Sequence, residues 1–378
     1  MIYVTFLITF VYAILILSFI IGFDKVKLFK TDGSKSKNTF TIIIPFRDEA
    51  KNLSSLLESL SALNYPKELF EIILVNDDST DDSVEVIKCH LEQSREARPD
   101  TSIIDNIRKS NSPKKDAIET AIQQSKFDWI VTTDADCIVP KKWLQLFDEF
   151  IQKNDSEMIC APVTYNLNNS LLEQFQLLDF ISLIGSTIGN FGIKKPFLCN
   201  GANLCYSKKS FHKVNGFEGN DNIASGDDIF LLEKINATFP SKIYFLKSFD
   251  SVVFTEPQHT FKQLISQRVR WASKTKSYQN WFGKFVGISV LLMNLLIILL
   301  VIYSLLDISV LKTLTLVFLI KSIVDFTLIF KTLIFTKQSK NITSYPIIAI
   351  LHPFFIVFTT FLSIFKNSYN WKKRTFKL

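Results

Sequence analysis

Acidic side chains gather at three points of the sequence, where each group follows or opens an apolar run. The acids of interest are Asp77, Asp134, Asp136, Asp227 and Asp228. Carboxylates in such positions suit two kinds of chemistry. They bind hard divalent cations such as Mg²⁺ or Mn²⁺, and they remove protons as general bases.

The segments around these acids predict the scaffold that positions them. Residues 38–258 alternate short β-branched runs with helical patterns, which predicts an α/β domain with a mostly parallel central sheet. Strands are expected at residues 39–45, 70–75 and 129–133. A helix with leucines at three- and four-residue spacing follows the first strand (Leu53, Leu56, Leu57 and Leu60). Open sheets of this class bind ligands at the carboxyl ends of their strands, where the first two acidic groups fall.

The Asp-x-Asp pair at residues 134 and 136 directly follows a predicted strand. In extended backbone, residues i and i+2 point the same way, so Asp134 and Asp136 can present two carboxylates to one cation. Mg²⁺ or Mn²⁺ held there would keep positions open for the oxygens of a diphosphate and would neutralise its charge as it leaves. An Asp-x-Asp is common by chance, so its place at a strand end carries this inference.

The other acids have simpler explanations that remain open. Ser79 or Asp81 could be the N-cap of a helix that begins near Val84, although capping requires one oxygen and the turn at residues 76–83 has four acids. Asp227 and Asp228 could be carboxylates favourably placed at a helix N-terminus. Their functional interpretation is a general base.

Composition excludes several classes of protein. Forty-three Lys and Arg against 36 Asp and Glu give a net charge of +7. This charge is too small and too dispersed to indicate nucleic-acid binding, but it suits a protein that lies against anionic lipid. The five cysteines form no CxxC pair, which argues against a zinc site or a disulfide framework and favours a reducing compartment. Neither GxxxxGK[ST] nor GxGxxG occurs, so the usual ATPase, GTPase and dinucleotide signatures are missing.

Part of the chain is expected in lipid, because 47% of its residues are hydrophobic and its mean hydropathy is +0.20. Residues 2–23 carry no charge, and 22 residues at 1.5 Å each span roughly 33 Å, enough to cross a membrane. Residues 1–24 are therefore expected to form a transmembrane helix. A cleaved signal peptide is the alternative, but no Lys or Arg precedes the apolar run. Lysines follow it, so the positive-inside rule predicts an outside N-terminus and a cytoplasmic α/β domain.

The region 285–365 predicts two to three further spans. Residues 285–306 and 341–365 are almost uncharged, whereas residues 313–335 carry Lys321 and Asp325 near their middle. Four residues apart, these two side chains share a helix face and can neutralise each other; an interfacial helix is the alternative for this segment.

The basic tail, residues 366–378, conflicts with a count of four full spans. Positive-inside predicts a cytoplasmic tail, but four spans from an outside N-terminus would leave it outside. One of the three C-terminal segments is therefore expected to be re-entrant or interfacial, and the sequence does not say which. Before them, residues 259–281 predict an amphipathic interface helix that carries Gln267, Arg270 and Trp271, for which a basic aromatic anchor at the headgroups is the simpler explanation.

The order and spacing of these motifs resemble family 2 glycosyltransferases of the GT-A fold, over about residues 38–275. The similar branch is the membrane-bound one that includes ceramide glucosyltransferase-like and cellulose or hyaluronan synthase-like enzymes. The segments that carry the resemblance are Ile44-Pro45-Phe46-Arg47-Asp48-Glu49, Asn76-Asp77-Asp78-Ser79-Thr80-Asp81, Lys114-Lys115-Asp116-Ala117-Ile118, Asp134-Ala135-Asp136, Asn200-Gly201-Ala202-Asn203, Asp227-Asp228 and Gln267-Arg268-Val269-Arg270-Trp271.

The resemblance implies a role for each matched residue. Asp228 takes the base position, and Asp227 stands where the family has Glu, which leaves the division of labour between the two open. Asp136 and Asp134 would hold the metal. The implied donor-binding residues are Pro45, Glu49, Asp77, Lys114 and Asp134, and the implied acceptor or diphosphate residues are Asn203, Gln267, Arg270 and Trp271. Pro113 stands where the family has Gly, which weakens the implied phosphate contact of Lys114.

The implied function is an inverting, metal-dependent transfer of a sugar from a nucleotide-diphosphate sugar, expected to be a UDP-sugar, by single displacement. The acceptor would be a lipid or a glycan held at the cytoplasmic face of the inner cell membrane, and nucleic acid is not an expected partner. A processive polysaccharide synthase with the same active site is the first alternative. An inactive membrane scaffold that keeps the fold is the second.

Overall fold

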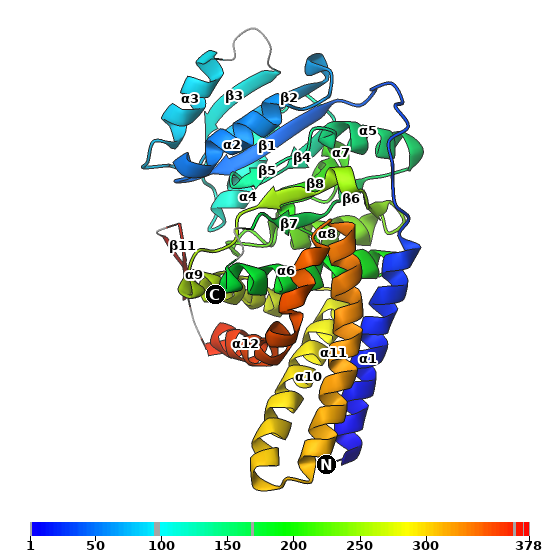
Figure 1. Ribbon diagram of the computed structural model, residues 1–378. Helices are drawn as coiled ribbons and strands as arrows, with labels where there is room; N and C mark the ends of the chain where they lie inside the picture. The colour runs from blue at the N-terminus through cyan, green and yellow to red at the C-terminus, as the bar shows by residue number, and fades with distance from the viewer. Residues whose placement is uncertain (1, 94–98, 168–169, 366–367, 373, 378) are drawn as a thin grey trace.

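The chain has an α/β domain above a set of long apolar helices (Figure 1). A computed structural model describes residues 2–93, 99–167, 170–365, 368–372 and 374–377. The predicted α/β domain and N-terminal helix are both confirmed.

A seven-stranded sheet forms the centre of the domain, in the order β3-β2-β1-β4-β8-β6-β9. Neighbouring strands β3, β2, β1 and β4 are parallel, β8 pairs antiparallel with both β4 and β6, and β6 is parallel to β9. The strands are β1 (Phe40–Phe46), β2 (Phe70–Asn76), β3 (Asp100–Asp105), β4 (Trp129–Thr132), β6 (Met158–Cys160), β8 (Leu204–Ser207) and β9 (Ile243–Phe245). A smaller sheet contains β5 (Cys137–Ile138), β10 (Val253–Thr255) and β7 (Val163–Tyr165).

The sequence explains the central strands and their helices. Ile42, Ile43 and Ile44 of β1 are fully buried, as expected for a parallel strand covered on both faces. The four leucines predicted to face the core are buried on α2. Helices of this domain are α2 (Ala50–Ser61), α3 (Ser83–Gln93), α4 (Pro113–Gln124), α5 (Trp143–Lys153), α7 (Lys208–Lys213) and α8 (Asp227–Thr238).

Strand β3 was not among the predicted strands. It is an edge strand that pairs with β2, and its residues are exposed or half-buried. Without a buried apolar run, its sequence gave no strand signal, although its pairing extends the parallel half of the sheet.

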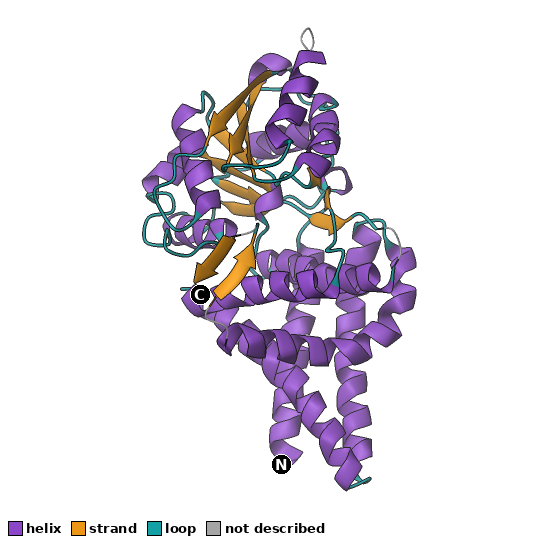
Figure 2. Cartoon of the chain, turned by 90° about the vertical axis from the view of Figure 1, so that its left-hand side faces the viewer, coloured by secondary structure: helices purple, strands orange, loops and turns teal. Residues whose placement is uncertain are grey.

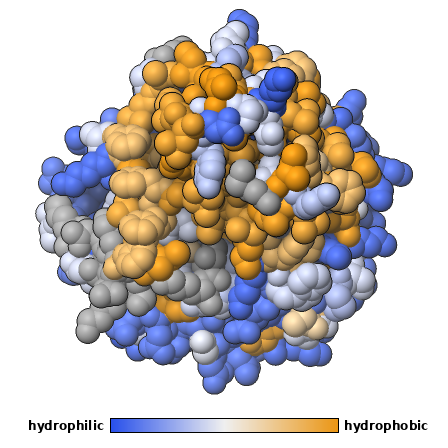
Figure 3. Space-filling view, turned by 90° about the horizontal axis from the view of Figure 1, so that it is seen from below, coloured by the Kyte–Doolittle hydropathy of each residue, from blue (hydrophilic) through white to orange (hydrophobic). Residues whose placement is uncertain are grey.

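Three long helices run side by side away from the sheet: α1 (Ile2–Lys25), α10 (Trp281–Leu306) and α11 (Val310–Phe335). They are long and apolar enough to cross a membrane, as is the stretch Ser339–Phe365. Seen from the end opposite the sheet, apolar residues cover the middle of the surface and hydrophilic residues border it on most sides (Figure 3). This distribution supports membrane association.

Helix α12 (Tyr345–Phe365) lies across the others instead of beside them, close to the α/β domain (Figures 1 and 2). It packs against α9 (Phe261–Ser273) and α10. The stretch Ser339–Phe365 still has the length and composition of a membrane span, so the expectation that one of the three C-terminal segments is re-entrant or interfacial stays a prediction. Arg374, in the tail that follows α12, contacts Asp77 of the α/β domain.

Glycines bring α1 into backbone contact with α6 (Leu171–Gly192), which runs beneath the sheet. A Cβ added at Gly192 would lie 1.8 Å from the carbonyl oxygen of Gly22, and one at Gly189 would lie 2.5 Å from that of Phe19. Side chains at these positions would push the helices apart. The close approach therefore joins α6, beneath the sheet, to the first long apolar helix.

The predicted pairing of Lys321 with Asp325 is confirmed. Lys321 Nζ lies 2.6 Å from Oδ2 of Asp325, and the hydroxyl of Tyr12 on α1 donates to Oδ1 of the same carboxylate at 2.7 Å. Both charges are thus paired within the helix bundle, as a low-dielectric setting demands.

Candidate active site

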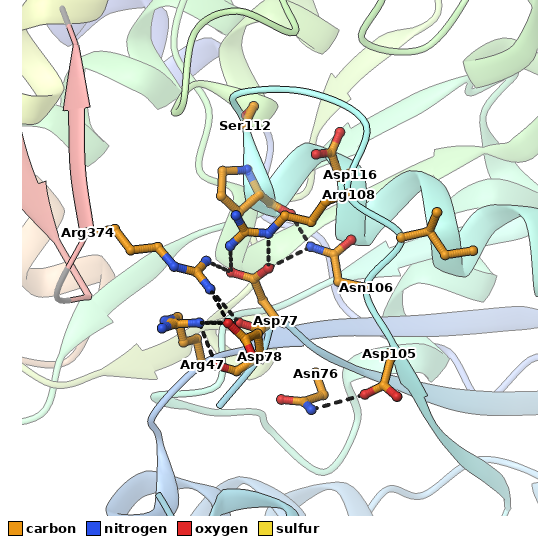
Figure 4. A network of polar contacts seen from close by, with 12 residues as sticks. Arg47, Asn76, Asp77, Asp78, Asp105, Asn106, Arg108, Ser112, Asp116 and Arg374 are labelled. Atoms are coloured by element: carbon orange, nitrogen blue, oxygen red, sulfur yellow. Dashed lines mark hydrogen bonds and ion pairs between the residues drawn. The ribbon is translucent and has the colours of Figure 1, made fainter. Parts of the chain in front are cut away.

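The Asp77 carboxylate, just after β2, is surrounded by cationic and amide groups (Figure 4). Its Oδ1 accepts from Arg108 Nε at 2.9 Å and from Asn106 Nδ2 at 2.8 Å. Its Oδ2 accepts from Arg374 Nη1 at 2.6 Å, and from Arg108 Nη2 at 3.2 Å. The side chain is 7% exposed, so this is a buried, paired charge at the ligand-binding edge of the sheet.

Glu49 lies one strand away, at the end of β1. Its carboxylate accepts from Asn52 Nδ2 at 2.6 Å and forms an ion pair with Lys372. Its backbone N–H donates to the hydroxyl of Ser83, which ties the ends of β1 and β2 together. Pro45 of β1 lies opposite Val75 of β2 at this edge. The predicted donor-side residues Pro45, Glu49 and Asp77 therefore lie at the same edge of the sheet.

Asp81 belongs to the scaffold of this edge. Its Oδ1 accepts from the backbone N–H of Ser83 at 3.1 Å, and its Oδ2 accepts from that of Ala50 at 3.0 Å. One carboxylate thus stabilises the starts of both α3 and α2, which confirms the simple capping explanation for this acid.

Asp134 and Asp136 lie in a turn between β4 and β5, because β4 ends at Thr132. The N–H of Cys137 donates to the carbonyl of Asp134 at 3.2 Å and closes this turn. The expectation of extended backbone at the pair is therefore wrong, but the two carboxylates still interact. Burial, followed by the charges of Asp134 and Glu49, raises the pKa of Asp136 to about 7.

This carboxylate group fits a divalent cation. The carboxylates of Asp134 and Glu49 act on Asp136 electrostatically, and carboxylate oxygens are the ligands that Mg²⁺ and Mn²⁺ prefer. No group of three acidic, His or Cys side chains in the described ranges could hold a metal by itself. An ion at Asp134 and Asp136 would therefore depend on ligand oxygens to complete its coordination, as Mg²⁺ sites commonly do.

Lys114 joins the metal-side acids to the second acidic pair. Its Nζ lies 2.6 Å from Oδ1 of Asp134 and 3.2 Å from Oδ2 of Asp227. Burial lowers the pKa of Lys114, but the charges of Asp134 and Asp227 outweigh it and hold that pKa above its usual value. Burial likewise raises the pKa of Asp227, and Lys114 with Lys274 overcomes it to keep that pKa low. Asp227 is thus a paired, ionised acid.

Asp228 starts α8 beside the turn at Asn200. Its Oδ1 accepts from the N–H of Ile229 at 2.8 Å, its Oδ2 accepts from that of Gly201 at 3.3 Å, and Lys274 Nζ lies 3.9 Å away. Sixteen per cent of the side chain is exposed. Asp228 therefore has weaker ionic pairing than Asp227 and keeps some access to solvent, as a proton acceptor requires.

The turn at Gly201 has no space for a side chain. A Cβ there would lie 2.9 Å from Oδ2 of Asp227, 3.5 Å from Nζ of Lys114 and 3.6 Å from Cβ of Asp228. The backbone approaches the acids this closely because the residue is glycine.

Asn203, predicted to face the acceptor, lies within the scaffold of the domain. It is fully buried; its Oδ1 accepts from Trp143 Nε1 at 2.8 Å, and its Nδ2 donates to the carbonyls of Pro162 and Ser251. Its amide is used in contacts within the scaffold, and the acceptor-side role of Asn203 stays a prediction.

Helix α9 carries Gln267, Arg270 and Trp271. Gln267 Oε1 accepts from Arg268 Nη1 at 2.6 Å, and the Trp271 ring lies 4.2 Å from the Arg268 guanidinium and 5.9 Å from the ring of Phe180 on α6. Arg268 in turn pairs with the buried Asp179 at 2.6 Å. These contacts hold α9 against α6, whereas Arg270 is half-buried and contacts the chain elsewhere. The structure thus gathers the predicted acids and Lys114, while Gln267 and Trp271 make their described contacts within the helix layer.

Sequence reasoning missed several cations near the acids. Arg108 follows the unpredicted strand β3, and Lys274 follows α9, so neither stood in a recognised motif. Lys372 and Arg374 come from the basic tail, about 300 positions from the acids they contact. A local sequence signal for those two contacts does not exist.

Comparisons with known proteins agree with this geometry. The profile described as Glycosyl transferase family group 2 matches residues 129–361, and that described as Glycosyl transferase family 2 matches residues 41–214. A poly-beta-1,6-N-acetyl-D-glucosamine synthase of Staphylococcus epidermidis is 22% identical over 259 residues, which cover 66% of this chain and 57% of the relative. The corresponding synthase of Staphylococcus aureus strain COL is 28% identical over 148 residues, which cover 38% of this chain and 33% of the relative. The chain thus matches between one third and three fifths of these relatives' lengths.

Among solved structures, a mannosyltransferase from Pyrobaculum calidifontis in complex with GDP-Man and Mn²⁺ shares the fold. The match has a TM-score of 0.55 at 13% identity and covers 92% of this chain and 96% of that one. It extends over both the α/β domain and most of the helix layer.

Proposed function

This chain belongs to glycosyl transferase family group 2, and we propose that it moves a sugar from a nucleotide-diphosphate sugar to a lipid or glycan acceptor at the membrane surface. The observation that carries the proposal is the double contact of Lys114, 2.6 Å from Asp134 and 3.2 Å from Asp227. It sets the carboxylates suited to a metal and a diphosphate beside those suited to a base. A transferase needs both in one site.

On the donor side, Asp77 and Glu49 would accept hydrogen bonds from the nucleoside. Both carboxylates lie at the carboxyl edge of the parallel strands, where ligands of open sheets bind. Lys114 would contact the diphosphate, since its ammonium lies between Asp134 and Asp227 and remains charged. A UDP-sugar is our first candidate donor.

Asp134 and Asp136 would hold Mg²⁺ or Mn²⁺ together with diphosphate oxygens. When bound, such an ion supplies positive charge that stabilises the leaving diphosphate. Arg270 is a candidate for further charge stabilisation from α9. Asp134 and Asp136 would hold the ion in place, and Lys114 would add a cation beside the diphosphate.

On the acceptor side, we assign Asp228 as the general base. It would take the proton from an acceptor hydroxyl while that oxygen forms a bond to the anomeric carbon. The bond from the anomeric carbon to the diphosphate oxygen breaks, its electron pair leaves with the nucleoside diphosphate, and the configuration inverts. Gly201 N–H, which donates to Asp228, and Lys274 would keep this carboxylate in place.

The membrane helices support a membrane-held acceptor. Helix α9 lies against α12, which runs across the other apolar helices next to the domain. An acceptor whose tail stays in lipid would approach the site from this layer. We further propose that the domain faces the cytoplasm, because lysines follow α1 and none precedes it.

A processive polysaccharide synthase is the second candidate. The matched staphylococcal relatives favour it, since they are named as synthases of a polymer. A polymer path through the membrane would have to be enclosed by helices. A single copy of this chain has few helices for this purpose, because α1, α10 and α11 run together and α12 lies across them.

One experiment tests the proposal and separates the candidates. Membranes that contain the protein are incubated with radiolabelled UDP- and GDP-sugars and Mn²⁺, and products are split into lipid-extractable and high-molecular-weight fractions. Transfer of a single sugar into the lipid fraction, lost in Asp228→Asn, is expected. A ladder of long products would favour the synthase, and no transfer above the Asp228→Asn background with any donor would refute the proposal.

A further inference from the structure

We propose that the C-terminal hairpin, β11 (Ser368–Trp371) and β12 (Arg374–Lys377), occupies the nucleoside subsite and competes with the donor for Asp77 and Glu49. The proposal rests on the proposed function for the identity of the displaced ligand. The hairpin is then a built-in inhibitor that must move aside before the nucleotide sugar binds.

Arg374 approaches the Asp77 carboxylate beside Arg108, and both guanidinium groups donate to Oδ2 (Figure 4). Its Nη1 donates to Oδ2 of Asp77 at 2.6 Å, and its Nη2 donates to Oδ2 of Asp78 at 3.0 Å and to the carbonyl of Asp77 at 3.3 Å. One guanidinium thus fills three acceptors on the turn after β2. This fork geometry is what makes arginine specific for carboxylates.

Lys372 occupies the second carboxylate of the subsite. Its Nζ pairs with Glu49 and lies 3.4 Å from the carbonyl of Asp48. Lys372 and Arg374 therefore contact both of the acids proposed to bind the nucleoside.

The competition follows from the hydrogen-bonding capacity of these acids. A nucleoside recognised by Asp77 and Glu49 must offer N–H or O–H donors, because an ionised carboxylate only accepts. Oδ1 of Asp77 accepts from Arg108 and Asn106, and Oδ2 accepts from Arg108 at 3.2 Å and from Arg374 at 2.6 Å, so the position that Arg374 takes on Oδ2 is the one that a ligand could use. Arg374 uses that oxygen, so a bound nucleoside and a docked hairpin exclude each other.

The hairpin is also easy to displace. In the part of the chain that the structure describes, β11 and β12 pair with each other and with no other strand. An isolated two-stranded hairpin is only marginally stable. Displacement of this hairpin also breaks no strand pairing with the α/β domain. The side chains of Lys372 and Arg374 are 27% and 20% exposed, which leaves solvent access to both ion pairs.

The fraction of molecules in which the hairpin is docked determines how much it weakens nucleotide binding. Partly exposed ion pairs each shift an equilibrium by a few-fold, and the apparent Kd of a competing ligand rises in proportion. Removal of Arg374 should therefore lower the apparent Kd for nucleotide by roughly 3- to 30-fold.

The test measures binding of UDP and of GDP, each with Mn²⁺, to the purified full chain in detergent. Arg374→Ala should bind one of these nucleotides about 3- to 30-fold more tightly than the unmodified protein does. Lys51→Ala is the matched control: Lys51 is an exposed cation on α2, with no ion pair in the described residues, and its loss should leave the Kd unchanged. Equal affinity of Arg374→Ala and wild type, or weaker binding by Arg374→Ala, would overturn the hairpin proposal and leave the proposed function standing.

A cross-link reports docking without relying on nucleotide affinity. In a Cys89→Ser background, which removes an exposed cysteine, Asn52→Cys and Lys372→Cys are joined with a flexible bismaleimide. Both positions lie beside Glu49, and Arg374 still pairs with Asp77 and Asp78 in this variant, so the cross-link should form in the free protein, and UDP or GDP should suppress it. A cross-link that never forms contradicts docking. One that persists although nucleotide binds contradicts competition, and failure of both nucleotides to bind any variant contradicts the proposed function and the competition together.

Discussion

Replacement of Asp228 by asparagine should remove most turnover while the fold and nucleotide binding survive. The change keeps the shape of the side chain and one accepting oxygen, so the N–H of Ile229 at 2.8 Å can keep its partner. The weaker bond from Gly201 at 3.3 Å is lost, which costs about 0.5–1.5 kcal/mol of stability. Loss of a negative charge at the start of α8 adds about 0.3–1 kcal/mol.

The expected kinetic effect is larger than these structural costs. A positioned general base contributes on the order of 10² to 10⁴ in rate, which is about 2.7–5.4 kcal/mol of activation free energy. Stability near the wild-type value with turnover reduced at least 100-fold would therefore identify a chemical role.

The assay is nucleoside diphosphate release from a nucleotide sugar in the presence of acceptor, together with the Kd for the nucleoside diphosphate and the melting temperature. Asp221→Asn is the matched control, because Asp221 is an exposed acid in the loop before α8. It should leave all three quantities unchanged. Near-normal turnover in Asp228→Asn with loss in Asp227→Asn would show that the base is Asp227.

Three further predictions address the metal, the turn and the topology. Asp136→Ala should abolish turnover with an unchanged circular dichroism spectrum, and EDTA should do the same to the wild type; full activity in EDTA would contradict a metal at this acid. Gly201→Ala, whose new Cβ would lie 2.9 Å from Asp227, should reduce kcat by about 10- to 100-fold, whereas Gly287→Ala, with open space around it, should not. In intact cells that carry a Cys89→Ser background, an impermeant maleimide should label Asp307→Cys in the loop between α10 and α11 and leave Lys35→Cys protected; the reverse pattern would invert the proposed orientation.

Strong local patterns made much of the fold predictable. The β1 and β2 runs are buried along nearly their whole length, the leucines of α2 are buried at three- and four-residue spacing, and the long apolar helices have the expected length and composition. The Lys321 and Asp325 pair could be predicted as well, since both lie on one helix face. These features depend on residues close together in the chain.

Features that depend on contacts between distant parts of the chain could not be predicted from the sequence. The apolar composition of α12 does not show how the helix packs, and its contacts with α9 and α10 come from segments elsewhere in the chain. Asn203 looked like a ligand-facing residue because of its motif. Its amide is used by Trp143, Pro162 and Ser251, which come from separate segments.

The same limit applies to the active site. The acids and Lys114 were predictable because each stands in a motif at the end of a strand or the start of a helix. Arg108 and Arg374, which bind Asp77, come from an edge strand without an apolar pattern and from the end of the chain. Their positions depend on the folded sheet and on the course of α12.

The central claim is that this site transfers sugar from a nucleotide sugar with the acids around Lys114. The most direct test is nucleoside diphosphate release by the purified full chain, supplied with a membrane lipid extract as acceptor, across a panel of UDP- and GDP-sugars with Mn²⁺. We predict release from at least one donor that requires the extract, and its loss in both Asp136→Ala and Asp228→Asn. Release that persists in both variants, or no release with any donor, would contradict the account.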